Sequence, residues 1–153
     1  MKKVPFPQAN SIELIFNILN DIGNEGISKL DVSKKYSINE RQGAYYLDTL
    51  LYLEFVQKIN TKYFLTRTGV EIRLSPYDHM KNKFIEEILK HDVIGMLYHK
   101  TKDLDKSEKK NIISNYLLTK LDMSLSTANR RANSIVSWFV WIDAIEREGI
   151  SNE

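Results

Sequence analysis

Proline occurs only at positions 5, 7 and 76 of this chain, and this spacing most constrains how it can fold. Residues 8–75 and 77–153 carry no residue that interrupts a helix by lacking a backbone N–H. The pattern therefore favours long helices on both sides of one strong break at Ser75-Pro76. We expect two domains, residues 8–76 and residues 77–147.

The composition narrows the classes of protein that the chain can belong to. Of 153 residues 42% are hydrophobic, enough to bury a core and to exclude wholesale disorder. The 22 basic and 20 acidic residues leave a net charge of only +2, so any affinity for nucleic acid requires local clustering of charge. Cysteine is absent, which excludes disulfides, thiolate metal sites and cysteine nucleophiles. With neither a signal peptide nor an apolar run of membrane-spanning length, we expect a cytoplasmic protein without membrane contact.

The first domain contains a repeated signal for the start of a helix, a capping residue followed three positions later by a carboxylate or an amide. It marks the expected starts of the first three helices, as Asn10 with Glu13, Ser28 with Asp31, and Asn39 with Gln42. We expect Gly23 to end the first helix as a left-handed cap. In the second helix we expect inward contacts from Leu30, Val32 and Tyr36, and in the third a buried stripe of Gly43, Leu47, Leu50 and Leu51.

After the third helix the spacing of the hydrophobic residues no longer follows the helical period. Residues 56–59 and 62–65 read as two strands joined at the polar tip Asn60-Thr61. Thr68, with Glu71 three positions later, is expected to cap a last short helix. The order of helix, helix, tight turn, helix and hairpin is that of a winged helix-turn-helix.

The second domain repeats this order more loosely. We expect one or two helices in residues 77–99, a charged loop at 100–106, a helix capped by Ser107 and a turn at 121–124. The longest helix should run from about residue 126 to 142, on the buried stripe Ala128, Ala132, Ile135, Phe139 and Ile142. Residues 144–146 could then form one strand, before a turn at 148–149. The predicted fold is mainly α with a small β-hairpin wing, a tandem winged helix-turn-helix whose second unit lacks a proper wing.

The outward face of the third helix carries candidate DNA-reading side chains, namely Arg41, Gln42, Tyr45 and Thr49. Arginine and glutamine pair with the edges of guanine and adenine, and a helix-turn-helix inserts the N-terminal end of this helix into the major groove. Lys58 and Lys62 flank the hairpin tip, where a wing contacts phosphates. The alternative is an ordinary solvated face.

The long helix of the second domain offers a comparable set, Thr127, Asn129, Arg130, Arg131 and Ser134. No acidic residue lies between Met123 and Trp141, so the two arginines form a compact positive field. Structural salt bridges are the alternative role for these arginines. Trp138 and Trp141 are interpreted as residues of the core or its edge.

The sequence lacks the usual motifs of enzymes. His79, His91 and His99 have no carboxylate at a fixed spacing, and no glycine-rich phosphate loop or Gly-x-Ser-x-Gly elbow occurs. Glu108-Lys109-Lys110 matches the end of a metal-dependent nuclease motif, but it falls in a charged loop or helix start rather than on a buried strand. We expect no catalytic site, no metal and no cofactor in this chain.

Three segments resemble a known family. Residues 40–56 (ERQGAYYLDTLLYLEFV) followed by 63–69 (YFLTRTG) are similar to the first winged helix of DNA-recognition regions in type II restriction endonucleases. Residues 126–142 (STANRRANSIVSWFVWI) resemble the helix that closes the following winged unit. The order of the two units resembles the FokI-like type of enzyme, and the resemblance spans about residues 8–147. It implies duplex recognition through Arg41, Gln42, Tyr45, Arg130 and Arg131, with cleavage by a separate nuclease domain or subunit.

The sequence thus predicts a module of a restriction system, or of a similar nuclease system, that binds double-stranded DNA in a sequence-specific manner. Two alternatives remain open. One is a winged-helix transcriptional regulator, which would bind palindromic DNA as a homodimer. The other is a protein-interaction adaptor that docks a partner through the same helical faces.

Overall fold

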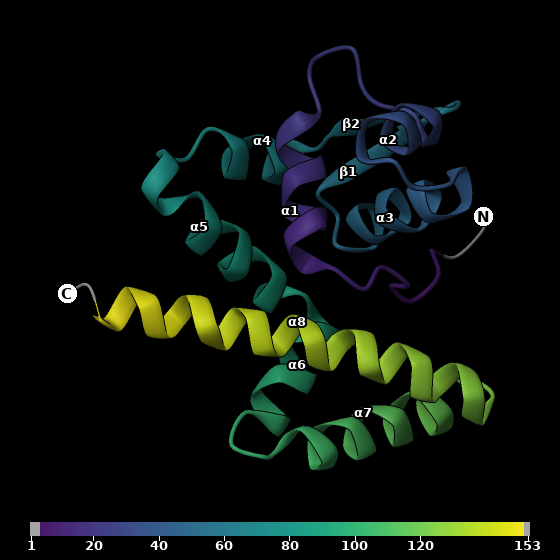
Figure 1. The fold of residues 1–153 in the computed structure, drawn as a ribbon, viewed down its shortest axis with the longest axis vertical. Coiled ribbons are helices and arrows are strands. Elements are labelled where there is room, and N and C mark those ends of the chain that lie inside the picture. Colours follow the sequence, from purple (N-terminus) through teal and green to yellow (C-terminus); the bar gives the residue numbers. More distant parts are fainter. Residues whose placement is uncertain (1–3, 152–153) are drawn as a thin grey trace. The chain divides into compact units, whose positions relative to one another are not determined.

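The computed structural model describes residues 4–151 and is mainly α-helical. These residues form eight helices and one small antiparallel hairpin (Figure 1). The chain divides into two compact units, Met1–Phe84 and Ile85–Glu153. Helix α5 (Tyr77–Lys90) contains the division, and it begins one residue after the domain boundary expected at Pro76.

Helix α1 (Ile12–Asp21) begins and ends differently from the prediction. Ser11, not Asn10, is the N-cap, because its side chain accepts a hydrogen bond from the Leu14 backbone N–H at 3.1 Å. The helix ends at Ile22, which has an extended backbone, so Gly23 does not form a left-handed cap. The left-handed glycine is Gly26, with φ of 77°. An added Cβ there would lie 2.8 Å from the Phe64 ring, so both backbone and packing require glycine.

Helices α2 (Lys29–Tyr36) and α3 (Glu40–Tyr52) follow the predicted caps. Ser28 and Asp31 form the reciprocal capping box, and Asn39 accepts from the Gln42 backbone N–H at 2.8 Å. The turn between the helices is made by Ser37 in the left-handed region, with φ of 56°. The helices approach so closely that a Cβ on Gly43 would lie 2.7 Å from the Lys29 carbonyl oxygen.

The hairpin is confirmed with its predicted tip. Strands β1 (Val56–Ile59) and β2 (Lys62–Leu65) pair in an antiparallel register that sets Ile59 opposite Lys62, and Asn60 has φ of 57°. A further contact was not predicted: Ile27, in the α1–α2 loop, forms an isolated antiparallel bridge with Tyr63. Helix α4 (Arg67–Arg73) is capped by Thr66 rather than Thr68, with the Thr66 hydroxyl accepting from the Gly69 N–H.

The core of the first unit is apolar and drawn from all of its elements. Among its fully buried side chains are Ile15, Ile18, Leu19, Val32, Leu47, Leu50, Phe55 and Ile72. The prediction for Leu30 was wrong, because 43% of this residue is exposed. Only Val32 of helix α2 is buried, since this eight-residue helix packs along a single narrow side against α3.

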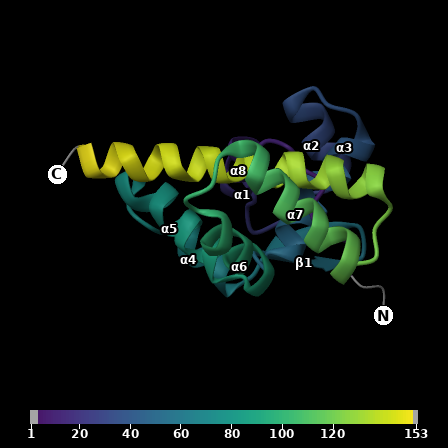
Figure 2. The ribbon, with the colours of Figure 1, turned by 90° about the horizontal axis from the view of Figure 1, so that it is seen from below.

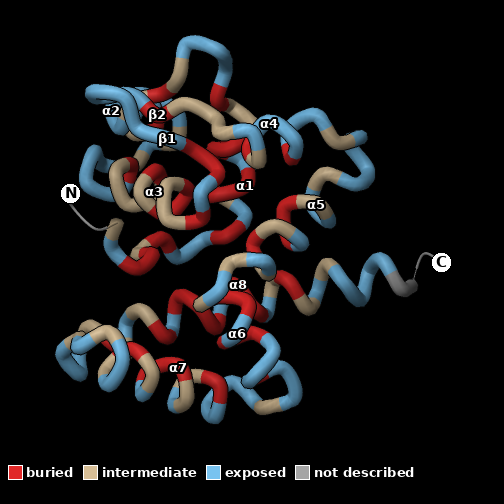
Figure 3. Tube along the Cα trace, turned by 180° about the vertical axis from the view of Figure 1, so that it is seen from behind, coloured by how far each residue is buried: buried red, intermediate tan, exposed pale blue. Residues whose placement is uncertain are grey.

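In the second unit α5 is followed by α6 (Asp92–Thr101), α7 (Lys106–Lys120) and α8 (Leu125–Ser151). Helices α7 and α8 pack alongside each other, and the predicted stripe Ala128, Ala132, Ile135, Phe139 and Ile142 is fully buried (Figure 3). Trp138 is also fully buried, as expected of a core residue. The cap of α7 is Asp105, which accepts from the Glu108 N–H at 2.8 Å, so the prediction of Ser107 was wrong by two residues.

Helix α8 continues through the predicted strand at 144–146 and the predicted turn at 148–149, and both predictions were wrong. A buried tyrosine contacts this extension. The single hydrogen of the Tyr98 hydroxyl is shared between Asp143 at 2.6 Å and Glu146 at 3.2 Å, two carboxylates one helical turn apart. The helical turn at residues 143–146 is what brings both carboxylates to this one hydroxyl.

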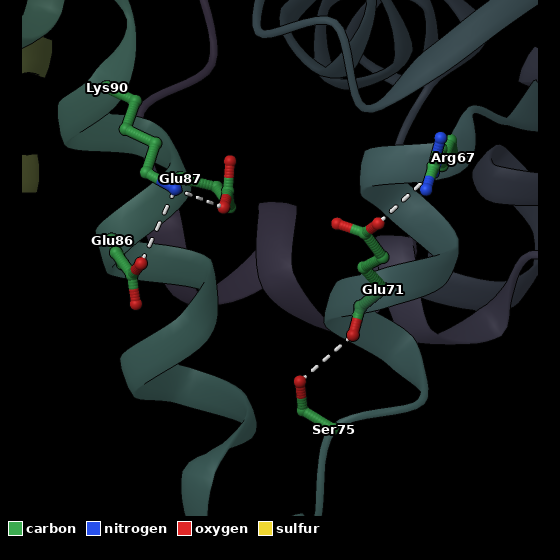
Figure 4. Close-up of polar contacts among 6 residues, drawn as sticks. All are labelled: Arg67, Glu71, Ser75, Glu86, Glu87 and Lys90. Carbon is green, nitrogen blue, oxygen red and sulfur yellow. Dashed lines mark hydrogen bonds and ion pairs between the residues drawn. The ribbon is translucent and has the colours of Figure 1, made fainter.

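Ion pairs on the surfaces of α4 and α5 follow helical spacing (Figure 4). Arg67 pairs with Glu71 in α4, and the Lys90 ammonium lies 3.4 Å from Glu86 and 3.0 Å from Glu87 in α5. The Arg67–Glu71 and Lys90–Glu86 pairs occupy exposed positions and contribute little to stability, whereas Glu87 is largely buried. Within residues 4–151 no helix combines the length and the hydropathy that a membrane span requires.

Candidate nucleic-acid interface

The N-terminal end of α3 presents two exposed polar side chains, Arg41 and Gln42. The Arg41 Nε donates to the Tyr45 hydroxyl at 2.5 Å, and the guanidinium carbon lies 5.6 Å from the centroid of the Tyr45 ring. Among the described residues no carboxylate forms an ion pair with Arg41. The guanidinium is thus held along the helix by an aromatic ring while its charge remains uncompensated.

Further along α3 the predicted outward face is covered. Thr49 is only 1% exposed, and its hydroxyl donates to the Tyr45 carbonyl at 2.8 Å, so its placement on the open face was wrong. Tyr45 is half-buried and lines a small pocket together with residues 5–8. The N-terminal segment explains this covering, because Phe6 is buried and stacks edge-to-face on Tyr52 at 5.7 Å. The N-terminal segment thus covers the side of α3 that carries Tyr45 and Thr49, and the exposed Arg41 and Gln42 lie in its first turn.

The hairpin carries the two lysines that the sequence indicates. Lys58 and Lys62 are both exposed on either side of the tip. The Lys58 ammonium lies 5.4 Å from the centroid of the Tyr63 ring, and the Lys62 ammonium donates to the Glu25 carbonyl at 3.4 Å. Neither lysine is ion-paired to a carboxylate within the part of the chain that the structure describes.

A groove of about 400 Å³ connects these elements within the first unit. The start of α2 lines it with Lys29 and Leu30, α3 with Ala44 and Asp48, and the hairpin with Lys58 and Thr61. From the sequence, Lys58 and Thr61 are expected at the hairpin tip and Asp48 on the outward face of α3, whereas Lys29 and Ala44 are not indicated as groove residues. Ala44 follows Arg41 at a spacing of three, which is the helical signal that could have identified it.

Asp48 has a fixed position in this groove. Its carboxylate accepts a hydrogen bond from the Tyr63 hydroxyl at 2.9 Å, which ties α3 to strand β2. Burial of the phenol, together with this hydrogen bond and the negative charge of Asp48, raises the pKa of Tyr63 above its usual range. The hydroxyl therefore stays protonated and holds the carboxylate in the groove that Lys58 also lines.

In the second unit the candidate residues on α8 are only partly open. Arg130 is exposed, and its guanidinium donates to the Thr127 hydroxyl at 3.4 Å. Ser134 is 6% exposed and donates to the Arg130 carbonyl, so its placement on the outward face was wrong. The Asn129 side-chain oxygen accepts from Ser114 of α7 at 2.7 Å, and Arg131 is half-buried. Packing of α7 against α8 thus takes up one side of the predicted reading face.

The nuclease-like run at 108–110 has a structural explanation. Lys109 is 6% exposed, and its ammonium donates to the carbonyl oxygens of Thr101 and Lys102, both at 3.0 Å. A lysine charge at this place satisfies the last carbonyl groups of α6. Within residues 4–151 no three His, Asp or Glu side chains gather closely enough to hold a metal ion.

Comparison with known proteins assigns the chain to a family without assigning a function. Residues 14–147 match the model of DUF7226, a domain of unknown function, and the chain belongs to this family. The match covers both units described above. No curated protein matches the chain, and no solved structure matches it.

Proposed function

We propose that the first unit is a winged helix-turn-helix and that the chain recognises double-stranded DNA in a sequence-specific manner. The observation that carries the proposal is the exposed, uncompensated Arg41 at the N-terminal end of α3, beside Gln42 and the two hairpin lysines. The order α1, Ile27 bridge, α2, α3 and hairpin supports it, because a winged helix has a short strand between its first two helices.

These side chains fall into two groups, those suited to reading base edges and those suited to positioning the helix on the DNA. An arginine forms two hydrogen bonds to a guanine edge, and a glutamine does the same to adenine. Exposed lysines at the hairpin and at the start of α2 would contact phosphates, which orient the helix but carry no sequence information. Asp48, in the same groove, could accept a hydrogen bond from the amino group of cytosine.

For the second unit we propose a helix-turn-helix without a wing. Helices α7 and α8 are joined by a turn at 121–124, which is the arrangement of a helix-turn-helix. Within the described residues no strand follows the start of α8. Arg130 and Thr127 in the first turns of α8 are the groups available to DNA. We place the chain as the recognition module of a type II restriction system or a similar nuclease system, with cleavage by a separate domain or subunit.

Selection of bound sequences from a random duplex pool, at two salt concentrations, tests this function. Four to six phosphate contacts predict that log affinity falls with log salt at a slope of about −4 to −5, together with enrichment of one sequence motif. A slope near zero, or a pool that shows no enriched motif, would contradict sequence-specific recognition of DNA.

A further inference from the structure

A second groove, of about 320 Å³, lies in the second unit between α6 and α7. Lys100 of α6 and Lys120 at the end of α7 lie among its lining residues. Between them α7 contributes Asn111, Asn115 and Thr119 along one stripe and Ile112 and Tyr116 along the next. Each stripe advances by four residues, so the groove follows the axis of the helix. Figure 2 shows both helices from below.

The polar side chains that line this groove are exposed, and most of them have no partner within the described part of the protein. Among residues 4–151 neither lysine is ion-paired, and the amides of Asn111 and Asn115 have no hydrogen-bond partner in the protein. Thr119 alone is engaged, through its hydroxyl and the Asn115 carbonyl at 2.8 Å. No acidic residue lines the groove. Two positive charges and two free amides therefore converge on one surface with no compensating negative charge.

We propose that this groove binds the phosphodiester backbone of the duplex, so that the second unit holds DNA through α6 and α7 in addition to α8. The inference rests on the proposed function. It adds a DNA contact on a surface of the second unit other than the exposed part of α8. From Asn111 to Thr119 the helix rises about 12 Å, which is long enough to face more than one phosphate of a strand.

The composition of the groove favours a nucleic-acid backbone over an acidic peptide. Asparagine, threonine and lysine are the side chains that commonly contact phosphates. A bound peptide needs deep apolar anchor pockets, and Ile112 and Tyr116 are both half-buried on the side of the groove. Contacts of this kind are independent of base sequence, so they should strengthen binding to every duplex equally.

The test compares two charge-matched double variants of the full chain, Lys100→Ala with Lys120→Ala, and Lys90→Ala with Lys106→Ala. Each removes two positive charges from the second unit, but the second pair lies outside the groove. The probe is a fluorescein-labelled 20-base-pair duplex in a salt titration. Loss of two phosphate contacts should reduce the slope by about 2 and weaken binding by up to about 60-fold at 0.1 M salt. The control pair should stay near the wild type.

Three results would overturn the inference. The first is an unchanged slope in the groove variant while the wild type still binds DNA, which leaves the proposed function intact. The second is a wild-type chain that binds no duplex, which removes the proposed function as well. The third is binding of labelled polyglutamate that the groove substitutions abolish while binding of the duplex is unchanged, because it would identify an acidic protein partner instead of DNA. Circular dichroism confirms that each variant is folded.

Discussion

Replacing Arg41 by alanine should weaken binding to the preferred DNA sequence while leaving the fold intact. The side chain is exposed, and its only contacts among the described residues are the hydrogen bond and the ring contact with Tyr45. A cation–π contact at an exposed site contributes about 0.5–1 kcal/mol to stability, so the variant should unfold close to the wild type. Loss of a bidentate contact to guanine costs about 1–3 kcal/mol, a decrease in affinity of about 5- to 150-fold.

Fluorescence anisotropy with the selected duplex, and with duplexes carrying single base-pair changes, measures this effect. Arg67→Ala is the matched control, since Arg67 is also an exposed arginine of the first unit and its ion pair with Glu71 is a weak surface contact. If Arg41 reads a base, its variant loses discrimination at one position while the salt slope is unchanged. A uniform loss on all duplexes, with the slope reduced by about 1, would refute base reading and indicate a phosphate contact.

Three further predictions concern the fold. Gly43→Ala should destabilise the protein by about 1–2 kcal/mol in urea unfolding, because a Cβ would meet the Lys29 carbonyl oxygen at 2.7 Å and the gain in helix propensity only partly offsets this overlap. Tyr98→Phe should cost about 1 kcal/mol at pH 7. That cost should shrink above about pH 10. Burial raises the folded-state pKa of Tyr98, so the unfolded chain loses this proton first, and the wild type loses more stability than the variant as pH rises. Lys109→Met should destabilise by about 1–3 kcal/mol, because the Lys102 carbonyl oxygen loses its donor and the Thr101 carbonyl oxygen keeps only the Leu104 backbone N–H, whereas Lys110→Met should change stability by less than about 0.5 kcal/mol.

Elements whose signals are local could be predicted from the sequence. The Ser28–Asp31 capping box and the Asn39 cap depend on hydrogen bonds that span three residues, so the residues themselves specify the starts of α2 and α3. The hairpin followed in the same way, because a two-residue polar tip at Asn60-Thr61 determines which residues of the two strands face each other. The buried stripe of α8 could also be predicted, from the helical spacing of its apolar residues.

Local signals failed where several candidates competed. Ser11 and Thr66 cap their helices in place of Asn10 and Thr68, although each pair offers suitable side chains only one or two residues apart. The choice depends on how the preceding segment approaches the helix. At residues 144–146 the expected strand became helix, where the hydroxyl of Tyr98, more than forty residues earlier, is bonded to Asp143 and Glu146.

By itself the sequence determined that the protein would be mainly helical with one hairpin, and that basic side chains would stand at the starts of α3 and α8. Only the tertiary structure decided which of the candidate side chains remain open: residues 5–8 cover the later turns of α3, and α7 engages Asn129. The two grooves likewise appeared only in the folded chain. The physical reason is that helical period specifies which residues share a face, whereas exposure depends on distant segments that pack against that face.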